Sequence, residues 1–162
     1  GGSSHIIMSA LMKNKKKFQY VASEISDELR DETYKNVKEI CDDGPRMIGD
    51  ITKNLPRIPQ RIDFLMIDTD HDLETTKWIV ENIFPHVQKG ALLSIHDWAV
   101  EEIDGNLVGK AEFGKGGWDE TNYYIDLIRE KKWPFKKVYW TWKNPAWFLM
   151  GSNWESGFWE KI

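Results

Sequence analysis

The sequence predicts an α/β fold with a mostly parallel sheet, helices on both faces and an antiparallel hairpin near the C-terminal end. The apolar run from Ile62 to Ile67 is too short for a helix and ends abruptly at polar residues, as a buried parallel strand does. From Asp72 the apolar residues follow the helical period, and after a Lys-Gly turn a second buried run extends from Ala91 to Ile95. Aromatic and β-branched runs at 137–142 and 146–150, separated by an Asn-Pro turn, predict the hairpin.

Two shorter strands, with a helix between them, are expected before this strand-helix-strand unit. Phe18 to Ile25 is rich in aromatic and β-branched residues, and Arg46 to Asp50 is a short run that follows an Asp-Gly-Pro break. Ser26 can cap the intervening helix. The buried face of that helix is expected to consist of Leu29, Thr33, Val37, Ile40 and Cys41.

The remaining elements follow from the same patterns. A first helix, with Ile7, Ala10 and Leu11 on its inner face, precedes the first strand, and a last helix is expected from Asp119 to about Lys131. The segment Ala99 to Gly117 is rich in glycine and acidic residues and is expected to be a loop over the strand ends. The helix after Asp72 is expected to bury Thr76, Ile79, Val80, Ile83, Phe84 and Val87.

Length and composition point to a single domain, residues 1–162. A chain of 162 residues with 41% apolar residues can bury one core. The net charge of −4 and the lack of a long basic face argue against a nucleic-acid partner. The basic run is expected to be a solvated helix end, and it consists of Lys13, Lys15, Lys16 and Lys17.

Other features bear on the setting of the protein. Cys41 is the single cysteine, so no internal disulfide can form, and no apolar stretch is long enough to span a membrane. A cytoplasmic protein without a membrane partner is expected, and a homo-oligomer is compatible with the sequence. Eight of the nine tryptophans lie from Trp98 onward. One interpretation is that some of them line a binding surface for a sugar or an aromatic ring. The alternative is that they pack at an edge strand or at a subunit interface.

Ionisable residues end both buried strands. Asp68, Asp70 and His71 follow the first strand, and His96 and Asp97 follow the second. Because the carboxyl ends of parallel strands meet at one edge of a sheet, these side chains are expected to gather where open α/β sheets bind ligands.

This arrangement resembles the second half of the class I S-adenosylmethionine (SAM)-dependent methyltransferases. The resemblance rests on the I-D-x-D-H sequence at 67–71, the helix and glycine turn that follow it, and the His-Asp pair at 96–97. It covers residues 1–98 well, and the nearest subgroup consists of O-methyltransferases that act on small molecules and sugars. It implies a Rossmann-like fold, SAM as cofactor, and methyl transfer to a hydroxyl of a sugar or other small-molecule substrate.

The resemblance gives the first residues a role in binding the cofactor. In the family a glycine-rich loop after the first strand leads into a helix, and Gly1, Gly2, Ser3 and Ser4 match the end of that loop. Ser3 or Ser4 also suits the N-cap of the helix. By this interpretation the chain lacks the first strand and is an N-terminally truncated fragment. The alternative is that these residues are an expression tag before Met8.

Further cofactor contacts are implied at three strand ends. The resemblance assigns Glu24 to the ribose hydroxyls of SAM, because a carboxylate accepts two hydrogen bonds; the alternative is a surface glutamate. Asp50 matches a residue near the adenine amino group, although the cap of a helix is a competing role for it. Asp68 is also expected beside the cofactor.

The resemblance also implies how the acceptor hydroxyl loses its proton. His71 is the expected base unless it only caps the following helix or bonds a carboxylate, and Asp70 either orients His71 or binds metal in place of Asp68. The expected ligands of Mg²⁺ or another divalent cation are Asp68, His96 and Asp97. Because His96 replaces an oxygen ligand of the metal-dependent relatives, a site without metal remains open.

Other functions compete with this one. A nicotinamide dehydrogenase would also place an acid at Glu24, and Tyr34 and Lys38 have the Tyr-x-x-x-Lys spacing of short-chain reductases, but on a helix far from a catalytic position. A metal phosphohydrolase built on His96 and Asp97 lacks an ordered set of further histidines. The stronger alternative is a non-catalytic or incomplete Rossmann-like domain that no longer binds cofactor.

Overall fold

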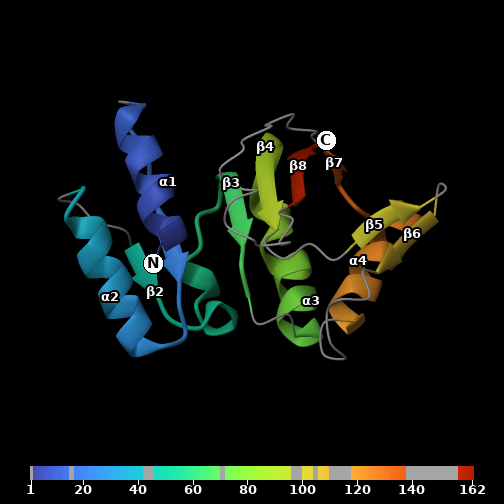
Figure 1. Cartoon of the computed structure of the whole chain (residues 1–162), viewed down its shortest axis with the longest axis horizontal. Coiled ribbons are helices and arrows are strands. Elements are labelled where there is room, and N and C mark those ends of the chain that lie inside the picture. Colours follow the sequence, from blue (N-terminus) through green and yellow to red (C-terminus); the bar gives the residue numbers. More distant parts are fainter. Residues whose placement is uncertain are drawn as a thin grey trace. The chain divides into compact units, whose positions relative to one another are not determined.

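The computed structural model describes residues 2–14, 17–41, 46–69, 72–95, 100–103, 106–109, 118–137 and 157–162. The chain forms two compact units, Gly1–Pro59 and Gln60–Ile162, and each contains helices and a pair of parallel strands (Figure 1). The predicted α/β fold, with parallel strands and an antiparallel arrangement near the C-terminal end, is confirmed.

The first unit combines a small parallel sheet with two α-helices. Its elements are α1 (Gly2–Lys13), β1 (Val21–Ser23), α2 (Asp27–Lys38), β2 (Arg46–Ile48) and two short 3₁₀ helices, η1 (Ile51–Lys53) and η2 (Leu55–Arg57). β1 and β2 pair in parallel, with Val21 opposite Arg46. β1 is shorter than the predicted run from Phe18 to Ile25, because its partner β2 offers only three residues to the ladder.

The buried faces of α1 and α2 differ in part from the predicted ones. In α1 Met8 is completely buried whereas Ala10, which was expected inside, is exposed. Ile7 and Leu11 are half-buried on either side of Met8, so the inner face is centred on Met8 and excludes Ala10. In α2 Thr33 and Val37 are buried as predicted, but Leu29 is 50% exposed. The buried part of α2 thus extends from the middle of the helix to its C-terminal end.

The second unit contains a four-stranded sheet of order β3-β4-β8-β7. The strands of this sheet are β3 (Ile62–Ile67), β4 (Val87–Ile95), β7 (Phe135–Lys137) and β8 (Gly157–Lys161). The unit also contains a separate pair of strands, β5 (Val100–Ile103) and β6 (Asn106–Gly109), and the helices α3 (Leu73–Asn82), η3 (Phe84–His86) and α4 (Trp118–Arg129). β3 and β4 are parallel, as predicted, with Leu65 opposite Leu93. Thr76, Ile79, Ile83, Phe84 and Val87 are buried as predicted. The helix itself is shorter than predicted, because α3 ends at Asn82 and Val87 already begins β4. The Lys-Gly pair that was expected to end the helix at a turn lies within β4.

The antiparallel strands that the structure describes are β7 and β8, which lie mostly outside the predicted hairpin. The expected hairpin at 137–142 and 146–150 falls almost entirely outside the described residues. In the described part, β8 lies between β4 and β7 and runs antiparallel to both. Leu93 of β4 faces Trp159 of β8, and Lys137 of β7 faces the same tryptophan.

The segment Ala99 to Gly117 was expected to be a loop, and its described part is instead an antiparallel hairpin. β5 pairs with β6, with Val100 opposite Gly109 and Ile103 opposite Asn106. An Asp-Gly dipeptide stands between these strands in the sequence and is a strong hairpin signal. The hairpin was not predicted because the acidic and glycine-rich composition of the segment was interpreted as that of a loop.

An aromatic cluster forms much of the core of the second unit. Its members are Phe84, Tyr124, Trp133, Phe135 and Trp159, all less than a tenth exposed. Trp133 lies at the centre, with ring centroids 5.7 Å from Phe84, 5.6 Å from Tyr124 and 5.8 Å from Trp159, each in an edge-to-face arrangement. Trp133 and Trp159 therefore pack in a core.

Among the described residues, no helix has the length and apolar character needed to cross a membrane.

Candidate functional site

The structure places only part of the predicted site. Gly1, Asp70, His71, His96 and Asp97 lie outside the described residues, so the predicted base and two of the predicted metal ligands have no described position. Within the ranges that are described, no group of three or more His, Cys, Asp or Glu side chains is arranged to hold a metal ion. The predicted residues that are placed are Gly2, Ser3, Ser4, Glu24, Asp50 and Asp68.

Gly2, Ser3 and Ser4 form the first turn of α1, so the helix begins before the predicted N-cap at Ser3 or Ser4. The Oγ atom of Ser4 accepts a hydrogen bond of 2.9 Å from the hydroxyl of Tyr20. Tyr20 directly precedes β1, and burial raises the pKa of its hydroxyl. Ser4 therefore ties the start of α1 to the start of β1.

Glu24 directly follows β1 and is held through its backbone and its side chain. Its N–H donates to the carbonyl oxygen of Ile48 at 3.0 Å, and its own carbonyl oxygen accepts from Nη1 of Arg30 at 3.4 Å. Its Oε1 accepts from the N–H of Ser26 at 3.0 Å. Carboxylate oxygens accept more than one hydrogen bond each, so this half-buried group keeps acceptor capacity for the hydroxyls of a ligand.

An exposed apolar residue, Ile25, follows Glu24. Its side chain is 70% exposed, and that of Leu29 in the first turn of α2 is 50% exposed. A single exposed apolar side chain is ordinary on a protein surface. Ile25 was not among the predicted site residues, and its exposure next to Glu24 is visible only in the structure.

Asp50 follows β2 and caps the 3₁₀ helix η1. Its Oδ1 accepts from the N–H of Thr52 at 3.0 Å and from the hydroxyl of Thr52 at 2.7 Å, and its Oδ2 pairs with Nζ of Lys53 at 2.8 Å. The hydrogen bond from Lys53, followed by those from Thr52, lowers the pKa of Asp50 to about 2. The competing role as a helix cap is therefore the one that Asp50 fills, and its contact with adenine stays a prediction.

Asp68 follows β3 in the second unit and is exposed. The cap of the next helix, α3, is Asp72, whose side chain accepts a hydrogen bond of 2.8 Å from the N–H of Thr75. The role of helix cap considered for His71 is thus taken by Asp72. The predicted roles of His71 as base and of Asp68 toward cofactor or metal stay predictions.

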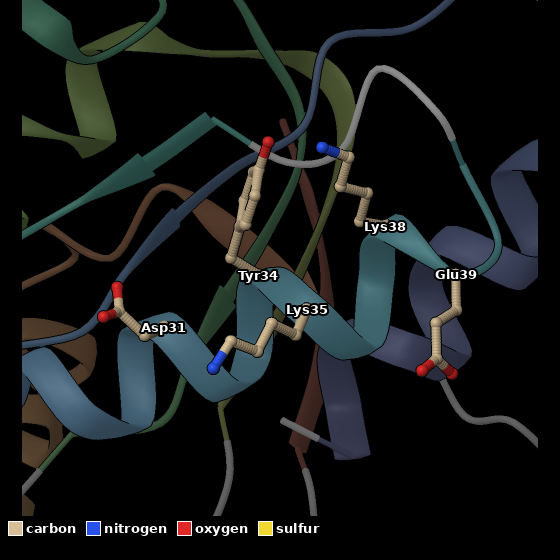
Figure 2. Close-up of a pocket in the computed structure, with 5 residues that line it drawn as sticks. All are labelled: Asp31, Tyr34, Lys35, Lys38 and Glu39. Carbon is tan, nitrogen blue, oxygen red and sulfur yellow. The ribbon is translucent and has the colours of Figure 1, made fainter.

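A separate open depression lies along the outer face of α2 (Figure 2). It has a volume of about 520 Å³ and is lined by Asp31, Tyr34, Lys35, Lys38 and Glu39. Nζ of Lys38 lies 5.6 Å from the ring centroid of Tyr34, so the Tyr-x-x-x-Lys spacing brings a cation over an aromatic face. All five side chains come from one exposed stretch of helix, and none is at a strand end. The spacing is therefore explained by a local contact on the helix surface.

Comparison with known proteins identifies the family. A family model described as a methyltransferase domain matches residues 1–98. No curated protein sequence matches the chain significantly. Among solved structures, a protein provisionally described as an rRNA-methylase from Clostridium thermocellum is similar over 89% of this chain and 75% of its own, with 16% identity and a TM-score of 0.57. The Methanococcus jannaschii fibrillarin pre-rRNA processing protein is similar over 89% of this chain but only 57% of its own, with 16% identity and a TM-score of 0.51.

These neighbours correct one prediction. Nucleic acid was excluded as a partner on the basis of net charge, yet this fold occurs in proteins described by their names as acting on ribosomal RNA or its precursor. Net charge sums over the whole chain and does not report the local surface that a nucleic acid would meet. The match to the family model spans more than half of the sequence and shows that the chain belongs to the methyltransferase-domain family. The chain has the fold of the class I methyltransferases, enzymes whose methyl donor is SAM.

Proposed function

We propose that the chain binds SAM at the end of β1 in the first unit and transfers its methyl group to a hydroxyl of a sugar or other small metabolite. The observation that carries the cofactor site is the position of Glu24. Its backbone and one carboxylate oxygen are fixed by hydrogen bonds from its own chain, while the half-buried carboxylate retains acceptor capacity. The choice of acceptor rests on the resemblance to O-methyltransferases of small molecules.

The residues at this strand end fit a nucleoside. Glu24 would accept hydrogen bonds from the ribose hydroxyls, and the exposed side chain of Ile25 offers an apolar surface to the base. The first turn of α1 presents backbone N–H groups that have no partner within the helix, as helix N-termini do, and Ser4 fixes that turn to the start of β1. Each of these groups belongs to the first unit.

The acceptor chemistry is proposed for the ends of β3 and β4. When bound, SAM supplies a methyl group activated by a positively charged sulfur. His71 is proposed to take the proton of the acceptor hydroxyl, because an imidazole titrates near neutral pH, and Asp70 is proposed to orient its ring. A divalent cation such as Mg²⁺ would be held by Asp68, His96 and Asp97, where carboxylate oxygens suit a hard cation. The resemblance supports His71 as the base and Asp68 and Asp97 as carboxylates beside a cation, whereas His96 replaces an oxygen ligand of the metal-dependent relatives.

RNA is a second candidate acceptor. It is supported by the two structural neighbours whose names refer to ribosomal RNA. On this chain, Lys13 and Lys17 are exposed near the end of α1, and lysine side chains there can meet phosphate groups. Transfer of labelled methyl groups from SAM to total RNA or to a panel of sugars and small alcohols would separate the two acceptor classes.

The test of cofactor binding is a calorimetric titration with S-adenosylhomocysteine (SAH), with and without Mg²⁺. Glu24→Ala is expected to weaken binding about tenfold or more, because hydrogen bonds to a charged group are each worth about 1.5–3 kcal/mol. Glu32→Ala is the matched control, since Glu32 is an exposed glutamate on α2 away from the strand ends.

The outcomes separate the proposal from its rival. Loss of affinity in Glu24→Ala but not in Glu32→Ala supports a cofactor site at the end of β1. A folded chain that binds no SAH would instead support a domain that no longer binds cofactor. Equal affinity in Glu24→Ala and the unchanged chain would place the site elsewhere.

A further inference from the structure

Arg30 lies at the ends of both strands of the first unit. It is in α2, one turn after the cap Ser26, and its side chain is 26% exposed. Its Nη1 donates to the carbonyl oxygen of Glu24 at 3.4 Å, and its Nη2 forms an ion pair with Asp27. The same Nη1 lies 3.4 Å from the point that a Cβ atom on Gly49 would occupy. The guanidinium therefore sits between the residue after β1 and the residue after β2.

The hydrogen bonds of Glu24 show what the guanidinium of Arg30 contributes. The backbone N–H of Glu24 is fixed to Ile48, and its Oε1 receives the N–H of Ser26. Arg30 supplies the hydrogen bond to the remaining backbone group, the carbonyl oxygen. Together these bonds fix both the peptide plane after Glu24 and the direction of its carboxylate. Without Arg30 that peptide plane loses its side-chain donor and the carboxylate loses part of its support.

The charge arrangement leaves the carboxylate of Glu24 available to a ligand. The ion pair of Arg30 is made with Asp27, whose side chain is 86% exposed, and the contact with Glu24 is made at the backbone. The side chain of Ser23 adds a bond of 2.8 Å to the carbonyl oxygen of Gly49, which ties the two strand ends together beneath the guanidinium. A Cβ atom at Gly49 would be in van der Waals contact with the guanidinium, which shows how closely Arg30 approaches the end of β2.

We propose that Arg30 is a positioning residue for the cofactor site, which holds Glu24 in the orientation that accepts the ribose hydroxyls of SAM. The proposal rests on the proposed function, because it acts through Glu24. Arg30 itself touches no part of the cofactor in this scheme.

A double-mutant cycle tests the proposal by SAH titration of the full chain, Arg30→Met, Glu24→Ala and the double variant. Arg30→Met is expected to weaken SAH binding about threefold to tenfold in the presence of Glu24, the effect of losing one hydrogen bond that orients a binding group. In the Glu24→Ala background the same change is expected to have less than about a twofold effect, because there is no carboxylate left to position. A residue with a merely structural role would give equal effects in both backgrounds.

Arg57 offers a matched control. Its Nη2 donates to the carbonyl oxygen of Met47 at 3.3 Å, so Arg57→Met also removes a bond from a guanidinium to a backbone carbonyl in the first unit, but one that is not made to Glu24. Arg57→Met is expected to leave SAH affinity unchanged within about twofold. Arg30→Lys, which keeps the charge and a donor, is expected to recover part of the affinity lost in Arg30→Met.

A second variant covers the case in which Arg30→Met does not fold. Gly49→Leu leaves Arg30 in place but adds a branched side chain whose Cβ would lie 3.4 Å from Nη1, and crowding of the guanidinium is expected to reproduce the loss of affinity only when Glu24 is present. Hydrogen exchange without ligand gives an independent measurement, since the amide of Ser26 should exchange faster in both variants. If Glu24→Ala weakens binding and neither Arg30→Met nor Gly49→Leu does, the proposal for Arg30 fails and the cofactor site stands. If Glu24→Ala has no effect, the cofactor site itself fails.

Discussion

A buried polar contact between α3 and α4 gives a stability prediction that follows directly from the structure. The hydroxyl of Thr76 donates to Oε1 of Glu120 at 3.1 Å, and the two residues are 1% and 4% exposed. Tyr124 joins them, and burial, followed by the charge of Glu120, raises the pKa of its hydroxyl well above the ordinary value. Thr76→Val keeps the shape and the β-branch of the side chain but removes the donor from a buried carboxyl group.

The expected loss of unfolding free energy for Thr76→Val is about 1–3 kcal/mol, the range for leaving a buried polar group with one partner fewer. For a chain of this length each kcal/mol corresponds to a fall in melting temperature of about 2–4 °C. Thermal unfolding followed by tryptophan fluorescence reports on this unit, because Trp133 and Trp159 lie in its core.

Thr75→Val is the matched control for this measurement. Thr75 is in the same helix and is half-buried, and its structural bond to Asp72 is made by its backbone N–H, which the substitution keeps. It should change stability by less than about 0.5 kcal/mol. The reasoning would be refuted if Thr76→Val were as stable as the unchanged protein, or if Thr75→Val lost as much.

Three further predictions concern stability and pH. Because the pKa of Tyr124 is raised in the folded state, its contribution is fully present below the unfolded pKa of about 10 and is lost as pH rises through the higher folded value. Tyr124→Phe should therefore flatten the alkaline decline in melting temperature between pH 9 and 11, and an unchanged decline would contradict this assignment. The pKa of Asp50 is lowered to about 2, so its contribution is present above its unfolded pKa and is lost as pH falls through about 2. Asp50→Asn should reduce the dependence of stability on pH between 4 and 2, and hydrogen exchange in η1 should become faster. Trp133→Ala removes the centre of the aromatic cluster and should cost about 3–5 kcal/mol in urea unfolding, whereas a cost below about 1 kcal/mol would show that the cluster is loosely packed.

The central elements could be predicted because their signal is local. β3 matches the predicted residues from Ile62 to Ile67, since an apolar run between polar ends marks a buried strand. The face of α3 follows from its helical period. β8 was missed, because Gly157–Lys161 forms a strand through its pairing with β4 and β7, and partners far away in the sequence leave no local mark.

The site was predictable only in part. The place of Glu24 at a strand end follows from the sequence, but the bonds that fix it come from residues whose proximity depends on the fold. The role of Asp50 could not be decided from its position in the sequence, because the same carboxylate suits a ligand or a helix cap. Its bonds to Thr52 and Lys53, which decide for the cap, are visible only in the structure. The position of Arg30 between Glu24 and Gly49 likewise depends on how closely the two strand ends approach.

Hydrogen exchange with and without SAH is the most direct measurement of the central claim, that this chain binds SAM at the end of β1. We expect saturable protection in the segment from Ser23 to Arg30, which contains Glu24 and the start of α2. The protection should disappear in Glu24→Ala and persist in Glu32→Ala. A folded chain that shows no protection at saturating SAH, or protection confined to the second unit, would contradict the account.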